Sequence, residues 1–322
     1  MHVREGSTAD VTVLVVAYRH AEYVLECLRS IKSQTVRPRK VIIADDHSPD
    51  NTTAIIEDFL ADNPGFGELR RNCSNIGLNR TLNQNLATID TTFMTYISAD
   101  DIMLPDRIER HVNLIAAQRD AALAYSDAIV IDAESEVVHP TSMIEFPWPA
   151  DHETREYPFA ALLQTNWVPA ASIFLRTAAL KRAGGYNPDI FYEDFELLVR
   201  LSKRHRFVYT EDTLVGVRRL DDSLGASGFS STSPRFLFSL DTALKHYEDA
   251  EDQLARVAAS RRWEIAKRAS RTTMRPAASF SLLWHARSGA SNRLAVAFHL
   301  VRWSLFVVTR TARSTVGGKS AT

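Results

Sequence analysis

The stretch Val11-Thr-Val-Leu-Val-Val-Ala17 decides the fold, because it is a short run of apolar, mostly β-branched residues. Such a run is typical of a strand that is buried on both faces of a parallel sheet. Two similar runs follow it, Lys40-Val-Ile-Ile-Ala44 and Phe93-Met-Thr-Tyr-Ile97, and segments with apolar residues at helical spacing lie between them. This alternation predicts an α/β protein with a mostly parallel central sheet flanked by helices.

Acidic residues follow two of these strands at the point where each strand ends. Asp45 and Asp46 come after the second run, and Asp100 and Asp101 come after the third. In open parallel sheets, ligands bind beyond the carboxyl ends of the strands. Paired carboxylates there can hold a divalent cation, which in turn neutralises a diphosphate. The alternative is that each pair belongs to a solvated turn before a helix.

A third acidic pair, Glu193-Asp194, opens a predicted helix shortly after Gly184-Gly185-Tyr186. One of these carboxylates can act as a general base that removes a proton from an attacking hydroxyl. The alternative is structural, because the helix dipole favours negative charge at a helix N-terminus.

The order and spacing of these motifs resemble those of the family 2 glycosyltransferases of GT-A (Rossmann-like) fold, from about Val11 to Arg218. Val13–Tyr18 resembles the opening strand of that family. Ala44-Asp-Asp-His-Ser-Pro-Asp50 resembles its base-binding motif, and Ser98-Ala-Asp-Asp101 resembles its DxD region.

The resemblance implies a site for a nucleotide-diphospho-sugar, a divalent cation and an acceptor. The implied donor contacts are Ala17, Tyr18, Asp45, Asp46, Asn75, Gly77, Asn83, Asp100 and Arg218. It also implies Mn²⁺ or Mg²⁺ held by Asp100 and Asp101, a base at Asp194 with Glu193 beside it, and acceptor contacts at Gly185 and Tyr186. If the resemblance holds, we also expect the loop Pro140–Pro158 and Trp167 to contact the acceptor.

The activity that the resemblance implies is metal-dependent transfer of a sugar from a UDP- or dTDP-sugar to an acceptor hydroxyl, with inversion. The acceptor would be a saccharide or lipid-linked, as in surface polysaccharide or glycolipid synthesis. Two departures leave open a sugar-nucleotide-binding protein with impaired catalysis, since Ser98 replaces the first DxD aspartate and Leu220 replaces a histidine that many relatives have two residues after Arg218. In addition, His47 replaces a glycine of the base-binding motif. The change at His47 is tolerable where the backbone is not left-handed.

The composition fits a soluble globular protein, since 45% of the 322 residues are apolar and 24% are charged. The two cysteines, Cys27 and Cys73, exclude a disulfide framework, and the N-terminus has no apolar signal-peptide core. We therefore expect a cytoplasmic protein.

The net charge of −1 hides an acidic body and a basic tail. Residues 256–322 contain 13 Lys or Arg and one acidic residue, Glu264, which gives a net charge of +12. We expect residues 1–225 to form the catalytic domain and residues 226–322 to form a basic, α-helical appendage. Few aromatic residues are interleaved with the arginines, so we expect no nucleic-acid binding.

The most apolar stretch of the appendage is Leu294–Val308, but His299 and Arg302 interrupt it. It is also shorter than the roughly 20 residues of a membrane-spanning helix. A helical wheel places large apolar residues on one side and a polar face on the other, made of His299, Arg302, Thr309, Arg310 and Arg313. This pattern fits a helix that lies on an anionic membrane surface, at the inner face of the cell membrane. The alternative is that the helix packs on the catalytic domain or on another subunit.

Overall fold

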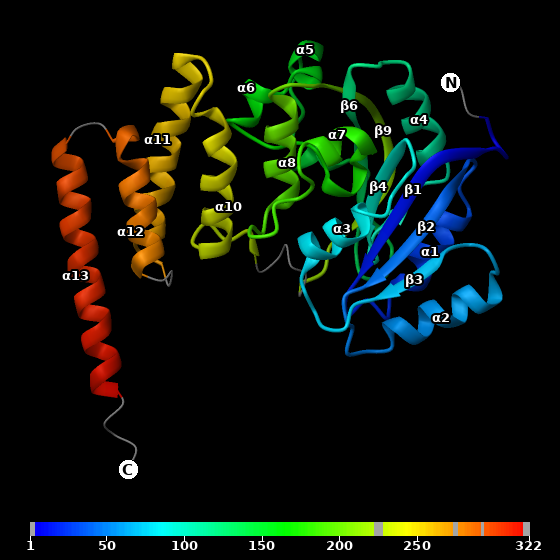
Figure 1. Ribbon diagram of the computed structural model, residues 1–322, viewed down its shortest axis with the longest axis horizontal. Helices are drawn as coiled ribbons and strands as arrows, with labels where there is room; N and C mark the ends of the chain where they lie inside the picture. The colour runs from blue at the N-terminus through cyan, green and yellow to red at the C-terminus, as the bar shows by residue number, and fades with distance from the viewer. Residues whose placement is uncertain (1–3, 222–227, 273–275, 291–292, 318–322) are drawn as a thin grey trace. The chain divides into compact units, whose positions relative to one another are not determined.

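The computed structural model describes residues 4–221, 228–272, 276–290 and 293–317, and the chain divides into two compact units (Figure 1). The first unit consists of Met1–Asp189 and Arg200–Asp221. The second consists of Ile190–Val199 and Asp222–Thr322.

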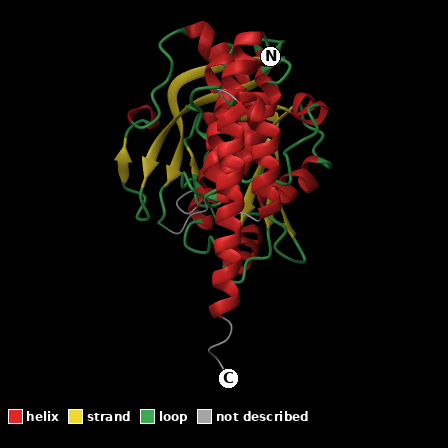
Figure 2. Cartoon of the chain, turned by 90° about the vertical axis from the view of Figure 1, so that its left-hand side faces the viewer, coloured by secondary structure: helices red, strands yellow, loops and turns green. Residues whose placement is uncertain are grey.

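The first unit is built on a twisted sheet with helices packed around it (Figures 1 and 2). Within the described residues the sheet has nine strands, in the order β3-β2-β1-β4-β8-β6-β9-β5, with β7 paired to β6. The strands are β1 (Thr8–Ala17), β2 (Arg37–Asp45), β3 (Glu68–Arg71), β4 (Phe93–Ser98), β5 (Ile102–Met103), β6 (Ala121–Ile131), β7 (Val137–His139), β8 (Phe174–Arg176) and β9 (Arg206–Arg218). β1 to β4 are parallel to one another, and β6 and β9 form a second parallel pair. β8 is antiparallel to both β4 and β6, and β5 is antiparallel to β9.

Helices cover the sheet and bury the apolar faces of its strands. The helices of this unit are α1 (Val24–Lys32), α2 (Thr52–Asp62), α3 (Leu78–Leu86), α4 (Arg107–Ala116), α5 (His152–Glu156), α6 (Phe159–Leu162) and α7 (Thr177–Arg182). Val13 and Val15 of β1 belong to one core with apolar residues of α1, α2 and α4. Leu14 and Val16, on the opposite face of β1, are buried as well. β1 is therefore buried on both faces, as its unbroken apolar run predicts.

Two long strands replace four short strands that the sequence suggests. The segments expected at 121–126 and 128–132 belong to the single strand β6, which ends at Ile131, and those at 206–209 and 213–218 belong to the single strand β9. The ladder between them shifts register, because Ser126 pairs with Thr210 whereas Asp127 pairs with Thr213. Glu211 and Asp212 thus form a bulge, which interrupts the apolar pattern without ending the strand.

The second unit is helical within its described residues. Its helices are α10 (Pro234–Leu244), α11 (Asp252–Ala269), α12 (Pro276–His285), α13 (Arg293–Gly317) and the first part of α8 (Glu193–Ser202). The N–H groups of Phe191 and Tyr192 both donate to Ser239 Oγ on α10, and Tyr192 packs against Phe229 and Phe236. These contacts explain why Ile190–Val199 groups with the C-terminal helices.

The expected domain boundary at 225/226 lies outside the described residues, and the division into units falls at 221/222. The predicted fold class, a mostly parallel sheet flanked by helices and followed by a helical region, is confirmed. Of the described helices, none combines the length and the hydropathy that a membrane span requires.

Candidate functional site

The carboxyl ends of three neighbouring strands meet at one edge of the sheet. Ala17, the last residue of β1, pairs with Asp45 of β2, and Val16 pairs with Ser98 of β4. The segments that follow β1, β2 and β4 therefore begin side by side. Tyr18 continues from β1 with a partly exposed side chain. This edge is also where the order of the parallel strands reverses, since β2 and β3 lie on one side of β1 and β4 lies on the other.

Asp45 is fully buried and stabilises the turn after β2. Its carboxylate accepts hydrogen bonds from Ser48 N–H, at 3.2 Å, and from Thr53 Oγ1, at 3.0 Å, as well as from the Ser48 hydroxyl. Asp50 then accepts a hydrogen bond from Thr52 N–H at the start of α2. Asp45 thus has a turn-forming role in this structure, and its contact with a nucleotide base stays a prediction.

Asp46 joins the end of β2 to the start of α3. Its two carboxylate oxygens accept hydrogen bonds from Ile76 N–H at 2.9 Å, from Gly77 N–H at 2.8 Å and from Asn72 Nδ2 at 2.8 Å. Gly77 has a φ of +87°, which a glycine adopts without strain. Asn75 is exposed just before this junction. The Asn-Ile-Gly segment is thus brought to the same edge of the sheet, as the resemblance implies.

His47 has a φ of +65°, so the left-handed backbone that favours glycine is present at this position. The change from glycine to histidine was expected to be tolerable only where the backbone is not left-handed, so that expectation does not apply at this position. For a residue other than glycine, this conformation costs about 1–2 kcal/mol.

Asp100 and Asp101 occupy the turn between β4 and β5, and they differ in their surroundings. Asp101 Oδ1 accepts a hydrogen bond from Arg218 N–H at 2.8 Å. Asp100 Oδ1 is buried and has no hydrogen-bond partner among the described residues, while Asp100 Oδ2 lies 3.8 Å from Nε2 of His20. Burial, and the neighbouring carboxylate of Asp100, raise the pKa of Asp101.

A divalent cation fits this turn chemically. Asp100 presents a buried oxygen without a partner, and a cation there would offset the repulsion between the two adjacent carboxylates. Among the described residues, no three His, Cys, Asp or Glu side chains gather closely enough to hold a metal ion. A cation would therefore need further oxygen ligands from a bound diphosphate.

Cys27 of α1 lies beneath the same turn, with its thiol donating to Ser98 O at 3.8 Å. Burial, followed by the charges of Asp101 and Asp100, raises the pKa of this thiol. Cys73, in contrast, is exposed beside Asn72.

Arg218 is buried and holds the loops around the turn together. Its guanidinium donates to Asp100 O at 2.8 Å and to Asp132 O at 2.6 Å, and it pairs with Glu26 at 2.5 Å. The guanidinium also stacks on the ring of Tyr23, at 4.8 Å. The guanidinium thus has a structural role, and the phosphate contact expected of Arg218 stays a prediction.

Asn83 and Tyr186 clamp α3 to the loop that follows α7. Asn83 Nδ2 donates to Tyr186 O at 2.7 Å, and Tyr186 N–H donates to Asn83 Oδ1 at 2.8 Å. A Cβ at Gly185 would lie only 2.4 Å from Asn83 Oδ1, so this position requires glycine. Tyr186 is buried against Tyr96. In this structure Asn83, Gly185 and Tyr186 form a packing junction, and their donor and acceptor contacts stay predictions.

Trp167 has a packing role in this structure. It is 1% exposed, and its indole N–H donates to the hydroxyl of Tyr125 at 3.2 Å. Its contact with an acceptor stays a prediction.

Glu193 and Asp194 lie in the second unit, in the first turn of α8, and both are buried. Burial, and next the Glu193 carboxylate, raise the pKa of Asp194 well above the ordinary aspartate value. A raised pKa suits a general base that works near neutral pH. One turn later, Glu196 pairs with His246 Nε2 at 2.6 Å.

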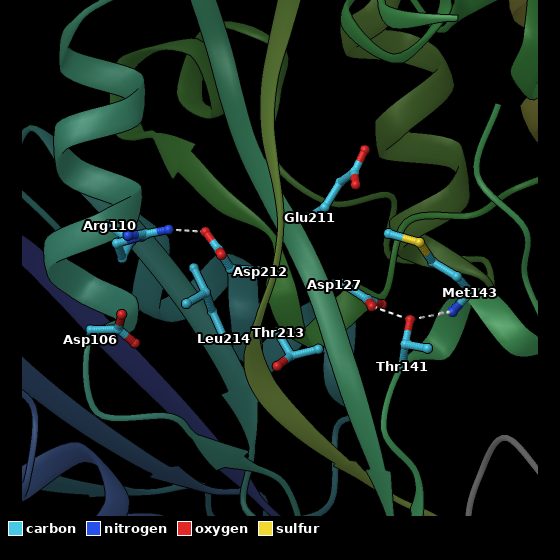
Figure 3. Close-up of a pocket in the computed structure, with 9 residues that line it drawn as sticks. All are labelled: Asp106, Arg110, Asp127, Thr141, Met143, Glu211, Asp212, Thr213 and Leu214. Atoms are coloured by element: carbon cyan, nitrogen blue, oxygen red, sulfur yellow. Dashed lines mark hydrogen bonds and ion pairs between the residues drawn. The ribbon is translucent and has the colours of Figure 1, made fainter. Parts of the chain in front are cut away.

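The hollow shown in Figure 3 is separate from these residues. It measures about 500 Å³ and is lined by Asp106, Arg110, Asp127, Thr141, Met143, Glu211, Asp212, Thr213 and Leu214. Arg110 pairs with Asp212, and Thr141 donates to Asp127. Thr141 and Met143 belong to the Pro140–Pro158 loop, so this loop does border an open surface, but no predicted donor residue lines the hollow.

The chain belongs to glycosyl transferase family 2. The sequence model described as "Glycosyl transferase family 2" matches residues 12–181, slightly more than half of the chain. The predicted family and its GT-A fold are therefore confirmed, together with the sheet described above.

Curated relatives match over shorter ranges. Chondroitin synthase of Escherichia coli is 24% identical over 128 residues, which are 40% of this chain and 18% of that protein. The putative glycosyltransferase EpsH of Bacillus subtilis is 27% identical over 116 residues, which are 36% of this chain and 33% of that protein. The matched segment thus spans a third or less of the length of these two relatives.

Solved structures are similar over most of the chain. TarS 1-349 of S. aureus, in complex with UDP-GlcNAc, superposes with a TM-score of 0.60 at 17% identity, covering 80% of this chain and 72% of that one. The mannosyltransferase PcManGT from Pyrobaculum calidifontis, in complex with GDP-Man and Mn²⁺, gives a TM-score of 0.59 at 15% identity, covering 97% and 85%. At these identities the likeness shows the fold alone.

Sequence reasoning missed one side chain at the strand ends, His20, which the structure places beside Asp100. The available signal was its position, since it is a titratable residue three places after the last residue of β1.

The raised pKa of Asp101 predicts a pH-dependent stability in the absence of divalent cations. The folded chain favours the protonated form of Asp101 over the ionised form. The stabilisation that this preference gives is fully present below the ordinary aspartate pKa of about 4. That contribution is lost as the pH rises through the raised value. Asp101→Asn keeps an oxygen that can accept from Arg218 N–H but removes the charge. In EDTA at neutral pH it should therefore unfold at a higher temperature than wild type.

Thermal unfolding between about pH 5 and pH 8 measures this difference, and each kcal/mol corresponds to about 2–4 °C in Tm. The gap between the two proteins should widen as the pH rises. Asp90→Asn is the matched control, because it removes a carboxylate whose side chain is 76% exposed. A variant no more stable than wild type at the upper end of the range would contradict the prediction.

Proposed function

We propose that the protein is an inverting glycosyltransferase that uses a UDP- or dTDP-sugar and an acceptor hydroxyl, in the synthesis of a surface polysaccharide or glycolipid. Family membership and the polysaccharide synthases among its relatives support this proposal. The observation that carries it is the unpartnered, buried carboxylate oxygen of Asp100 at the meeting point of β1 and β4. An uncompensated polar atom at this position is consistent with a ligand-binding role.

In the proposed reaction the acceptor oxygen attacks the anomeric carbon from the side opposite the nucleotide. A bond forms between that oxygen and the carbon, while the bond from the carbon to the diphosphate breaks. Asp194 takes the proton of the acceptor hydroxyl, and Glu193 helps to position it. Asp100 and Asp101 hold the cation, and a Mn²⁺ or Mg²⁺ ion supplies charge stabilisation to the leaving diphosphate when it is bound.

Calorimetric titration of nucleoside diphosphates tests the donor site. Wild type should bind UDP or dTDP at least tenfold more tightly with Mn²⁺ than with EDTA, and Asp100→Ala should lose that gain because it removes the free carboxylate. GDP belongs in the panel, since the PcManGT structure holds GDP-Man. Asp90→Ala serves as the control for an exposed carboxylate. Folded wild-type protein that binds none of the three nucleotides would overturn the proposal.

Asp194→Asn tests the proposed base. It should lower the rate of sugar release from the donor, to water or to an acceptor, by about 10²–10⁴-fold, because no group then accepts the proton. Nucleotide affinity should stay within about twofold of wild type, since the base does not bind the nucleotide. Asp189→Asn is the control, with a side chain that is 71% exposed. Undiminished turnover would reject the assignment, and absent turnover in wild type that binds nucleotide would favour a binding protein with impaired catalysis.

We further propose that α13 docks on an anionic membrane surface. Leu294, Phe298, Val301 and Leu305 repeat at intervals of four, three and four residues and are 60–80% exposed, so they form one apolar stripe. The opposite side of the helix is packed, since His299 contacts the ring of Trp263 and Trp303 donates to Ser279 Oγ at 2.9 Å.

The charge around this stripe indicates the nature of the surface. No acidic residue follows Glu264 in the sequence, so the stripe is flanked by basic residues such as the exposed Arg302. His299 lies on the packed side instead of the predicted polar face. The side chains of Val308, Thr309, Arg310 and Arg313, which the prediction also used, lie outside those that the structure describes.

Vesicle flotation tests the membrane proposal. Wild type should float with phosphatidylcholine vesicles that contain phosphatidylglycerol and much less with pure phosphatidylcholine. The double variant Phe298→Ser, Val301→Ser should bind at least tenfold more weakly, since it removes two apolar side chains from the stripe. Val137→Ser, Val138→Ser is the matched control, because these valines are similarly exposed on β7. Equal flotation of both double variants would contradict the proposal. If wild type forms a dimer and only the Phe298→Ser, Val301→Ser variant disrupts it, the stripe binds a second copy of the chain instead.

A further inference from the structure

We propose that His20 is a protein ligand of the donor-bound cation and that it binds this cation together with Asp100. The inference rests on the proposed function, because it assumes a nucleoside diphosphate and a divalent cation at the carboxyl ends of β1 and β4. It differs from the assignment made on sequence, in which Asp100 and Asp101 alone supplied the protein ligands.

The first argument is that hydrogen bonds hold the backbone around His20 in place. Three consecutive N–H groups after β1 donate to side chains of the β2–α2 turn. Arg19 N–H donates to Ser48 Oγ at 3.1 Å, His20 N–H to Thr52 Oγ1 at 2.9 Å, and Ala21 N–H to Asp50 Oδ2 at 3.3 Å.

These bonds fix Arg19 at a φ of +61°, in the left-handed region. A non-glycine residue there costs about 1–2 kcal/mol, and such strain persists where the surrounding structure enforces it, often at functional sites. The result of this strained turn is that the imidazole of His20 is directed at the end of β4, beside Asp100.

The second argument is the gap between the two side chains. Nε2 of His20 and Oδ2 of Asp100 are 3.8 Å apart, which is too long for a hydrogen bond. Ligands at about 2.1 Å from one cation are separated by about 3.0 Å at a right angle and by about 4.2 Å across the ion. The observed gap therefore has the size that a shared cation would bridge.

The third argument is that both groups lack other partners. Nδ1 of His20 and Oδ1 of Asp100 are buried without a hydrogen bond to any described residue. A cation bound at Asp100 would give the Oδ1 oxygen of that carboxylate the partner that it lacks. Asp101, by contrast, already accepts a hydrogen bond from Arg218 N–H, so it is the less available of the two carboxylates.

This ligand set has a consequence for the choice of cation. Mg²⁺ prefers oxygen ligands, whereas imidazole nitrogen suits transition metals better. A site with one imidazole and one carboxylate, completed by phosphate oxygens, should therefore select Mn²⁺ over Mg²⁺. Removal of His20 should reduce that preference.

The test is a titration of Mn²⁺ followed by electron paramagnetic resonance of the free ion, in the presence of the nucleoside diphosphate that wild type binds. His20→Ala should lower Mn²⁺ affinity at least tenfold and Mg²⁺ affinity, measured by competition, by less than about threefold, since the loss of even an indirect metal contact costs about 10–100-fold. His205→Ala is the matched control, because His205 directly precedes β9 and so lies at the opposite edge of the sheet. If His20→Ala does not fold by circular dichroism, His20→Gln replaces it.

The outcomes separate this inference from the proposed function. Unchanged Mn²⁺ affinity in the His20 variants would overturn the inference while leaving the donor site in place. An equal loss of nucleotide affinity in EDTA and in Mn²⁺ would also overturn the inference, because His20 would then contact the phosphates directly. Absence of cation-dependent nucleotide binding in wild type would remove both.

Discussion

The crowding of four carboxylates at one edge of the sheet, three of them buried and that of Asp100 partly buried, is the constraint around which the site is organised. Placing a carboxylate out of water costs several kcal/mol unless hydrogen bonds or opposite charges compensate it. Asp45 and Asp46 are compensated by N–H and hydroxyl donors from their own turn and from the start of α3. Asp101 receives one N–H donor from β9. Asp100 receives none for one of its oxygens, and this is what makes it the centre of the proposed donor site.

Hydrogen bonds of the charged side chains also hold the loops at this edge of the sheet in place. The carboxylate of Asp46 ties the end of β2 to α3, and the Arg218 guanidinium ties the loop after β4 to the loop after β6. Two residues, Arg19 and His47, adopt left-handed backbone conformations at this edge of the sheet. Strain that is concentrated where ligands are expected indicates a surface shaped for binding more than for stability.

The sequence predicted the fold well because the signals for it are local. Buried strands such as Val11–Ala17 are recognised from their unbroken apolar runs, and the acidic residues at strand ends could be assigned to one edge from the topology alone. The continuity of the long strands β6 and β9, each expected as two short strands, was missed. In their ladder, a bulge at Glu211 and Asp212 breaks the apolar pattern without breaking the pairing.

The roles of individual side chains were harder to predict, because they depend on partners far away in the chain. Trp167 is expected from the sequence to contact the acceptor. In the structure its hydrogen-bond partner is Tyr125, which lies 42 residues away and belongs to the core. Arg218 is charged and suited to phosphate, but Glu26, 192 residues away, pairs with it. His20 shows the opposite case, since only the fold brings it to Asp100.

The contrast between the two cysteines gives the protein a built-in spectroscopic handle. Thiolate is the reactive form of cysteine, and the buried Cys27, whose thiol stays protonated, will resist alkylating reagents. Cys73 is exposed and directly follows Asn72, the residue that donates to Asp46. A maleimide dye added to the natural chain will therefore attach at a single position beside the nucleotide end of the proposed site. Its fluorescence offers a way to follow ligand entry in real time without any substitution in the chain.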